Sequence, residues 1–173
     1  YVRSSGSYSV IGYDFLINYL QGRFNSWLGY SFAEKEYNYP EFSPSIFPNN
    51  LDIRHTATFG VAYQSRKIHL STGLNWRTGK PFTQASGVDG NSIVYESPNS
   101  SRLIDYLRLD ISAIYKFKIS EGVQAECGAS IWNLTNNQNI VNIYYQLSDN
   151  EIIEEIQQYA LGFTPNFMFR ISF

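Results

Sequence analysis

Hydrophobic and polar residues alternate with a period of two along most of the chain. The alternation is clearest over 107–119, where the odd positions are apolar and the even positions are mostly charged or polar. It recurs over 55–64, 68–77 and 123–132, and less regularly over 11–20. Because successive side chains of a β-strand point to opposite faces, this pattern predicts amphipathic strands.

These predicted strands are long. Strands of globular proteins usually have about five or six residues, whereas a tilted strand needs about 9–11 residues to cross a bilayer. Aromatic residues make up 17% of the chain, and they suit a pleated surface. The sequence therefore predicts an all-β fold, an antiparallel transmembrane β-barrel.

The connections between strands also alternate, here in length. Tight turns are expected near Gly22, Arg66 and Gly122, and long polar loops over 37–53, 80–105 and 136–162. Short turns at one end and long loops at the other are typical of outer-membrane barrels, whose long loops are extracellular.

The third long loop has a pattern of its own. Its segments "NIVNIYYQL" and "EIIEEIQQYAL" flank the turn "SDN". We interpret them as a β-ribbon standing above the membrane, although the second segment alone is also compatible with a helix.

The chain ends in "PNFMFRISF", in which Phe167, Phe169, Ile171 and Phe173 alternate with less apolar residues. The alternation predicts a last strand that ends on the short-turn side. We expect this strand to pair with the first strand of the barrel, because closure leaves no unpaired edge in the membrane.

Five segments, taken in order and spacing, resemble the C-terminal end of TonB-dependent outer-membrane receptors. The resemblance is to the Bacteroidetes kind, which carries a carboxypeptidase-regulatory-like N-terminal domain, and it covers about 22–173. The segments are "LDIRHTATFGVAY" (51–63), "LNWRTGKPFT" (74–83), "RLIDYLRLDISAIYKF" (102–117), "ASIWNLTNNQNIVNIYY" (129–145) and "LGFTPNFMFRISF" (161–173).

The resemblance implies that residues 1–173 are one C-terminal portion, the last seven or so strands, of a 22-stranded barrel domain. It implies uptake of a scarce, bulky nutrient across the bacterial outer membrane. The implied partners are outer-membrane lipid, the receptor's plug domain and remaining strands, TonB through the N-terminal part, the barrel assembly machinery and a surface lipoprotein. Phe169, Ile171 and Phe173 would form the C-terminal assembly signal.

Composition narrows the function classes. The net charge is −2 with no basic stripe, so we expect no nucleic-acid partner. Cys127 is the only cysteine, which excludes an internal disulfide and disfavours a cysteine-based metal site. No run of about 18 apolar residues occurs, so no transmembrane helix is expected.

Candidate chemistry is sparse. His55 and His69 lie in predicted strands without neighbouring ligands, and Arg108 and Asp110 share a polar face as an expected ion pair. The acidic residues of 149–155 are interpreted as a solvated loop rather than a cation site. No Ser/His/Asp arrangement, phosphate loop or metal motif occurs. We therefore predict no enzymatic activity, no catalytic or metal site and no cofactor.

Aromatic residues are the remaining candidates. The alternation places Trp76 on the lipid face near the outer rim and Trp27 and Trp132 on the inward face. Trp27 and Trp132, with Tyr144 and Tyr145 of the ribbon, are candidates for ligand or lumen contacts. For the two tryptophans the alternative is packing against the plug.

Two other interpretations stay open at this stage. If the arms of the ribbon count as membrane strands, the chain is a complete eight-stranded barrel with a structural or adhesion role. If the apolar face points inward, the chain is a soluble, lipocalin-like ligand-binding barrel.

Overall fold

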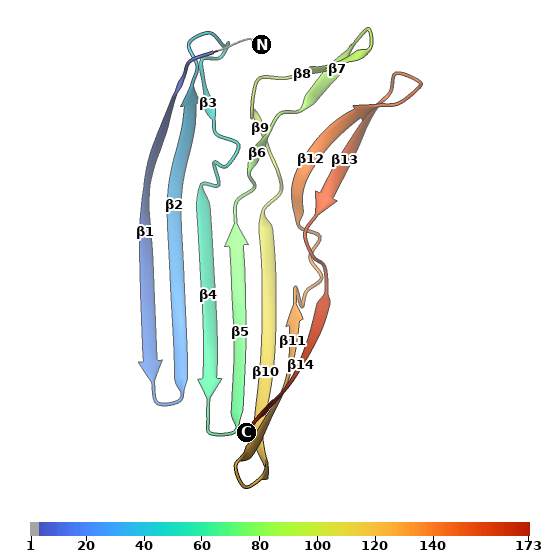
Figure 1. Cartoon of the computed structure of the whole chain (residues 1–173). Coiled ribbons are helices and arrows are strands. Elements are labelled where there is room, and N and C mark those ends of the chain that lie inside the picture. The colour runs from blue at the N-terminus through green and yellow to red at the C-terminus, as the bar shows by residue number, and fades with distance from the viewer. Residues whose placement is uncertain (1–3) are drawn as a thin grey trace.

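Seven long antiparallel strands form the main sheet of the computed structural model, which describes residues 4–173 (Figure 1). Each of these strands is hydrogen-bonded to the next one in chain order. Tight turns join them at one end of the sheet, and long connections join them at the other. The strands are β1 (Ser7–Gln21), β2 (Phe24–Asn38), β4 (His55–Gln64), β5 (Ile68–Arg77), β10 (Tyr106–Ser120), β11 (Val123–Trp132) and β14 (Thr164–Ser172).

The shorter strands all belong to the long connections 39–54, 78–105 and 133–163. The first connection holds β3 (Ile46–Pro48), which pairs with β2. The second holds two small pairs, β6 (Pro81–Phe82) with β9 (Ser101–Arg102) and β7 (Ala85–Asp89) with β8 (Ser92–Tyr95). The third holds the ribbon of β12 (Ile140–Leu147) and β13 (Ile153–Tyr159).

The all-β prediction is confirmed, and so is the ribbon in the third connection. The helical interpretation of "EIIEEIQQYAL" is wrong, since 153–159 is a strand paired with β12. The sheet is not closed, because β1 and β14 each have one neighbour among residues 4–173. Within that range, no helix long and apolar enough to span a membrane occurs.

The sheet has two chemically different faces. We call one the apolar face; it carries the odd-numbered residues of β1, β4, β10, β11 and β14 and the even-numbered residues of β2 and β5. The only charged residues on this face are Glu34 and Glu36, at the end of β2 that meets the long connections. All other charged residues of the seven strands lie on the opposite, polar face.

Few of the hydrophobic side chains are buried within the protein. Among the described residues, only Phe47, Leu103 and Ala125 are buried hydrophobic side chains. By contrast, Ile11 of the apolar face is 74% exposed and Phe167 is 85% exposed. The sheet therefore has no conventional core, and its apolar face is open to whatever surrounds it.

The strand register gives the sheet a steady slant. One row of cross-strand partners runs through Gln21, Phe24, Tyr63, Leu70, Ala113, Ala129 and Phe167. Gln21 ends β1, whereas Phe167 lies six residues before Phe173. Six residues correspond to about 20 Å along a strand and six strand spacings to about 29 Å across the sheet. The strands are thus tilted by about 35° from the perpendicular to a line that joins their turns, within the range of β-barrels.

Candidate functional site

The long connections gather at one end of the sheet, which we call the loop end; the tight turns form the turn end (Figure 1). The connections meet through buried polar groups. The side chain of Asp52 is fully buried, and it accepts hydrogen bonds from the backbone N–H of Lys35 at 2.8 Å and from the Arg102 guanidinium. Arg102 also donates to the carbonyl oxygens of Asp52 and Gly79. Asp52 therefore joins the first connection to the second by its ion pair with Arg102 and to β2 by its hydrogen bond with Lys35. It forms a second ion pair, with Arg54 of its own connection, at 3.3 Å.

Asparagines brace the third connection against the sheet. The fully buried Asn133 donates from Nδ2 to the carbonyl oxygens of Asn137 and Leu161, and its backbone N–H donates to Asp110 Oδ1 at 2.9 Å. Asn139, also buried, exchanges two hydrogen bonds with the backbone of Leu107. These bonds fix the exit of β11, the entry of β10 and the base of the ribbon relative to one another.

The ribbon of β12 and β13 contacts the second connection, both at the β7–β8 hairpin and at Lys80. The rings of Tyr145 and Tyr95 meet edge to face at 6.3 Å, and Lys80 Nζ donates to Asn142 Oδ1 at 3.3 Å. Burial, and to a smaller extent the Glu155 carboxylate, raises the pKa of Tyr145, so its hydroxyl stays protonated and donates to Glu155. Tyr144 points away from this contact and is 49% exposed, so of the two predicted tyrosines it is the one free to meet a ligand.

Trp27 and Trp132 lie in one cross-strand row on the polar face. Trp27 pairs with Gly60, Gly60 with Gly73, and Gly73 with Asp110. Trp132 continues the row on β11, because its neighbour Ile131 pairs with Ile111. The sequence predicted their shared face, and the register adds that they share one level. A hollow of about 220 Å³ between them is lined by Trp27, Ser71, Gly73, Asp110, Ser112, Ser130 and Trp132.

Each indole has its own support. The Trp27 ring lies over Gly60, where a Cβ atom would overlap it. The Arg108 guanidinium lies 5.9 Å from the centre of the Trp132 ring and forms an ion pair with Asp110 at 2.8 Å, as the sequence predicted. The hollow therefore has small glycine and serine residues in its middle and an indole ring at each end. Such a surface suits stacking and hydrogen bonding.

The other predicted residues are apart from this row. The His55 Nδ1 atom is 2.7 Å from the Tyr30 hydroxyl, and His69 lies on the other face of the sheet. In residues 4–173, no three or more His, Cys, Asp or Glu residues form a group that could hold a metal ion. Trp76 lies on the apolar face at the loop end, where its indole N–H donates to Asp105 at 3.2 Å. Phe169, Ile171 and Phe173 are exposed along the β14 edge.

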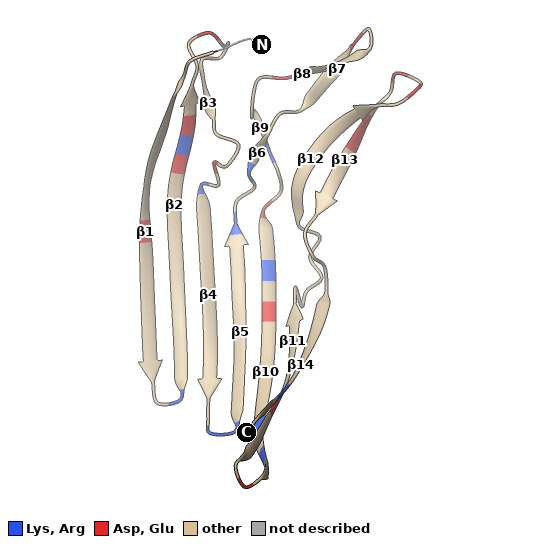
Figure 2. Ribbon diagram, in the orientation of Figure 1, with Lys and Arg blue, Asp and Glu red and all other residues tan. Residues whose placement is uncertain are grey.

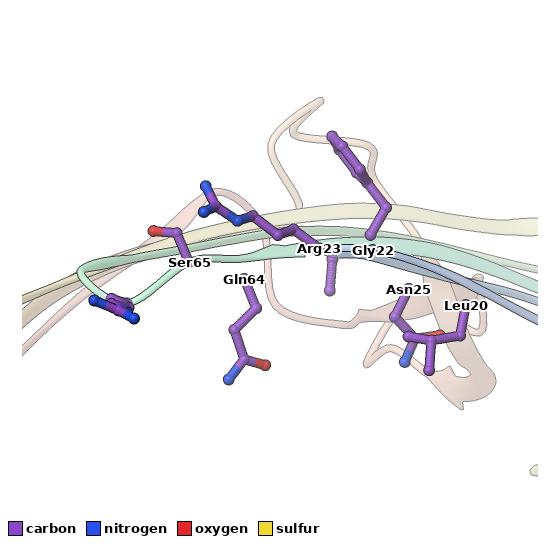
Figure 3. A pocket seen from close by; sticks show the side chains of 9 residues that line it. Leu20, Gly22, Arg23, Asn25, Gln64 and Ser65 are labelled. Carbon is purple, nitrogen blue, oxygen red and sulfur yellow. The ribbon is translucent and has the colours of Figure 1, made fainter.

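A second hollow, of about 600 Å³, lies at the turn end (Figure 3). Leu20, Asn25 and Gln64 point to one side of the backbone at these turns, and Arg23 extends on the other side. The side-chain oxygen of Asn25 is buried and accepts no hydrogen bond from the described residues. The hollow lies beside two neighbouring turns, which are joined by a hydrogen bond from the Gln64 N–H to the Arg23 carbonyl oxygen at 2.8 Å.

Comparison with protein-family models, with curated proteins and with solved structures finds no match for this chain.

Four structural residues escaped the sequence analysis: Asp52, Arg102, Asn133 and Asn139. The pairing of Asp52 with Arg102 joins residues fifty positions apart, which no local pattern encodes. The asparagines were visible as the run "NLTNNQN". Asn133 and Asn136 have positive φ, a conformation that asparagine tolerates, so this run could have indicated a corner.

We predict that Asp52→Asn loosens the loop end. The amide would keep an acceptor for Lys35 but would lose the charge that pairs with Arg102, at a cost of about 2 kcal/mol in the free energy of unfolding. Limited proteolysis should then cut 39–54 and 78–105 faster. Asp89→Asn, the same change in the exposed hairpin turn, is the control. Equal proteolysis of the two variants would contradict the role of Asp52.

We also predict that Gly60→Ala and Gly73→Ala differ, although both glycines lie in neighbouring strands of one row. A Cβ at Gly60 displaces the Trp27 ring, whereas the nearest atom to a Cβ at Gly73 is the Phe59 carbonyl oxygen at 3.9 Å. Overpacking should cost Gly60→Ala about 1–3 kcal/mol. Urea unfolding of the chain refolded in detergent micelles measures this cost. A loss of the same size at Gly73 would show that the ring does not rest on Gly60.

Proposed function

We propose that this chain is the C-terminal part of a β-barrel receptor of the bacterial outer membrane that imports a nutrient by TonB-dependent transport. The observation that carries the membrane part of the proposal is the exposed apolar face. It crosses all seven strands and, outside the loop end of β2, carries no charge.

An apolar surface of this extent is unfavourable in water. The largest apolar patch of a soluble monomer is typically about 300–600 Å². Here large side chains such as Ile11, Phe15 and Ile17 are each more than 60% exposed, and they continue as far as Phe169 on the opposite edge. Lipid chains would remove this surface from water without any further protein, which favours a bilayer as the surrounding medium.

Aromatic side chains border the apolar face at two levels. Tyr13, Tyr30, Phe32 and Trp76 lie toward the loop end, and Tyr19, Phe24, Tyr63 and Tyr115 toward the turn end. Phe32 and Phe24 are eight residues apart, about 26 Å along the strand and about 21 Å along the membrane normal after a 35° tilt. An outer-membrane barrel has an apolar band about 25 Å tall between two aromatic girdles.

The strand count favours part of a larger barrel over a complete small one. The arms of the ribbon, β12 and β13, pair only with each other among residues 4–173, so they do not bring the main sheet to eight strands. Single-chain bacterial barrels have even numbers of strands. A sheet of seven strands with two free edges therefore calls for additional strands, as the resemblance to a 22-stranded receptor implies.

The import step rests on the resemblance and on the loop end. The braced connections and the row from Trp27 to Trp132 would give a ligand two successive surfaces, one at the mouth and one on the lumen wall. In the receptor family a plug fills the lumen, and TonB couples its rearrangement to the proton-motive force. The proposed role is therefore transport.

Quenching by brominated lipids tests the membrane part. We predict that bromine in the acyl chains of reconstituted vesicles quenches Trp76 strongly and Trp27 and Trp132 weakly, because only Trp76 lies on the apolar face. Three variants that each keep one tryptophan, with phenylalanine at the other two positions, make the measurement specific.

Stronger quenching of Trp27 and Trp132 than of Trp76 would reverse the faces and contradict the proposal. A chain that stays folded and monomeric in detergent-free buffer would favour a soluble, lipocalin-like barrel instead. Accumulation of the nutrient by cells with the intact receptor, and its loss when the TonB system is inactivated, tests the import step.

A further inference from the structure

Charge is separated along the strands, as Figure 2 shows by the mostly blue turn end, where the turn between β10 and β11 is red, and by the mostly red long connections. The connections 39–54, 78–105 and 133–163 contain nine carboxylates and three cations. The turn end has the opposite balance. Its charged residues are the cations Arg23, Arg66, Lys67, Lys116, Lys118 and Arg170 and the carboxylates Glu121 and Glu126.

Only part of this positive charge is neutralised within the protein. Glu126 forms ion pairs with Lys116 at 2.9 Å and with Arg170 at 3.7 Å. In residues 4–173, no carboxylate lies within ion-pair distance of Arg23, Arg66 or Lys67. These three cations, which we call the turn cations, are exposed and belong to the two adjacent turns 22–23 and 65–67.

The structure holds the two turns side by side. The Gln64 N–H donates to the Arg23 carbonyl oxygen at 2.8 Å, and Ser65 closes its own turn by accepting a hydrogen bond from the Ile68 N–H at 2.9 Å. The Lys67 carbonyl oxygen accepts from the Lys116 N–H at 2.7 Å, which ties the second turn to β10. The turn cations therefore stand on a backbone that is fixed in place.

Arg23 lies at the border of the apolar face. Its guanidinium donates from Nη1 to the Tyr63 hydroxyl oxygen at 3.3 Å, and the rings of Tyr63 and Phe24 lie 5.0 Å apart. With its oxygen occupied as an acceptor, the Tyr63 hydroxyl can donate its own proton outward, beside the remaining guanidinium N–H groups. Several donors thus converge just beyond the last aromatic ring, where an apolar chain would end.

We propose that the turn cations, together with Tyr63, bind the phosphate of an anionic glycerophospholipid whose acyl chains lie on the apolar face. The occupant follows from the combination of features: paired guanidinium donors suit phosphate oxygens, and the adjoining aromatic rings suit acyl chains. A soluble anion would use only the charge, and an acidic protein would not require the apolar border. The inference rests on the proposed function, since it needs the apolar face to lie in a bilayer.

Lipid retention tests the proposal. The full chain is refolded in neutral detergent micelles that contain equal amounts of phosphatidylglycerol and phosphatidylcholine, and native mass spectrometry counts the lipids that remain bound. We expect phosphatidylglycerol to be retained at least tenfold over phosphatidylcholine. Arg23→Gln/Arg66→Gln/Lys67→Gln should lower this preference at least fivefold, because each basic residue near the headgroups adds to the affinity for anionic lipid.

The matched control is Lys116→Gln/Lys118→Gln/Arg170→Gln. It removes the same charge from the same end of the sheet, but from the polar face, and should keep the preference. Heat-dependent mobility in a detergent gel shows that each variant is folded. If this control does not refold, the single variants Lys67→Gln and Lys118→Gln provide the same comparison, each removing one charge.

Equal retention of the two lipids by the unaltered chain would overturn the proposal, and so would equal losses in the two triple variants. Binding of an acidic peptide without a preference for phosphatidylglycerol would also overturn it and would point to a protein partner. The quenching of Trp76 separates the two levels of inference. Strong quenching without a lipid preference removes only the lipid site, whereas absent quenching removes the proposed function as well.

Discussion

The structure depends on the cross-strand register, which keeps nearly all charges of seven strands on one face. Each strand alternates by itself, but only the pairing places apolar residues of one strand beside apolar residues of the next. A slip of one residue between β5 and β10 would bring Arg108, Asp110 and Lys116 onto the apolar face. Such burial of charge at bilayer depth is costly, so in the proposed membrane setting the register is strongly specified.

The loop end needs a different source of order, because it has almost no hydrophobic core. Phe47 and Leu103 are its only buried hydrophobic side chains among the described residues, whereas Asp52, Asn133 and Asn139 are its most deeply buried polar ones. Asp52 of the first connection is bound by Arg102 of the second, whereas Asn133 and Asn139 bond within the third connection and to β10. Each group is therefore satisfied only when two separate parts of the chain are in place. A buried polar group that loses its partner is destabilising, which makes the arrangement cooperative. This explains how three long, polar connections keep definite positions beside one another.

Much of the sheet could be predicted from the sequence, for a physical reason. The period of two is a local property, and in β10 nearly every position obeys it, with Ile114 on the polar face as an exception, so the faces of the strands follow from the residues alone. The placement of Trp27 and Trp132 on one face could be predicted in the same way. Their common level could not, because it depends on pairings across five strands. The contacts of Asp52 with Arg102 and of Tyr145 with Tyr95 join different connections, and no periodic pattern encodes them.

The two edge strands of the sheet, β1 and β14, have backbone groups without partners among the described residues, and this limits the surroundings in which the sheet is stable. β1 is fifteen residues long and exposed throughout, and β14 exposes Phe167 and Phe169 beside its unpaired edge. Unpaired backbone N–H and C=O groups are unfavourable in hydrocarbon, where no water can replace a missing partner. In the proposed bilayer, β1 and β14 must therefore pair with other strands. The 35° slant carried by the seven strands is already that of a barrel wall, so added strands can continue the same geometry. The row from Trp27 to Trp132 would then form one sector of a wider lumen, and a ligand held there would be contacted from the remaining sectors as well.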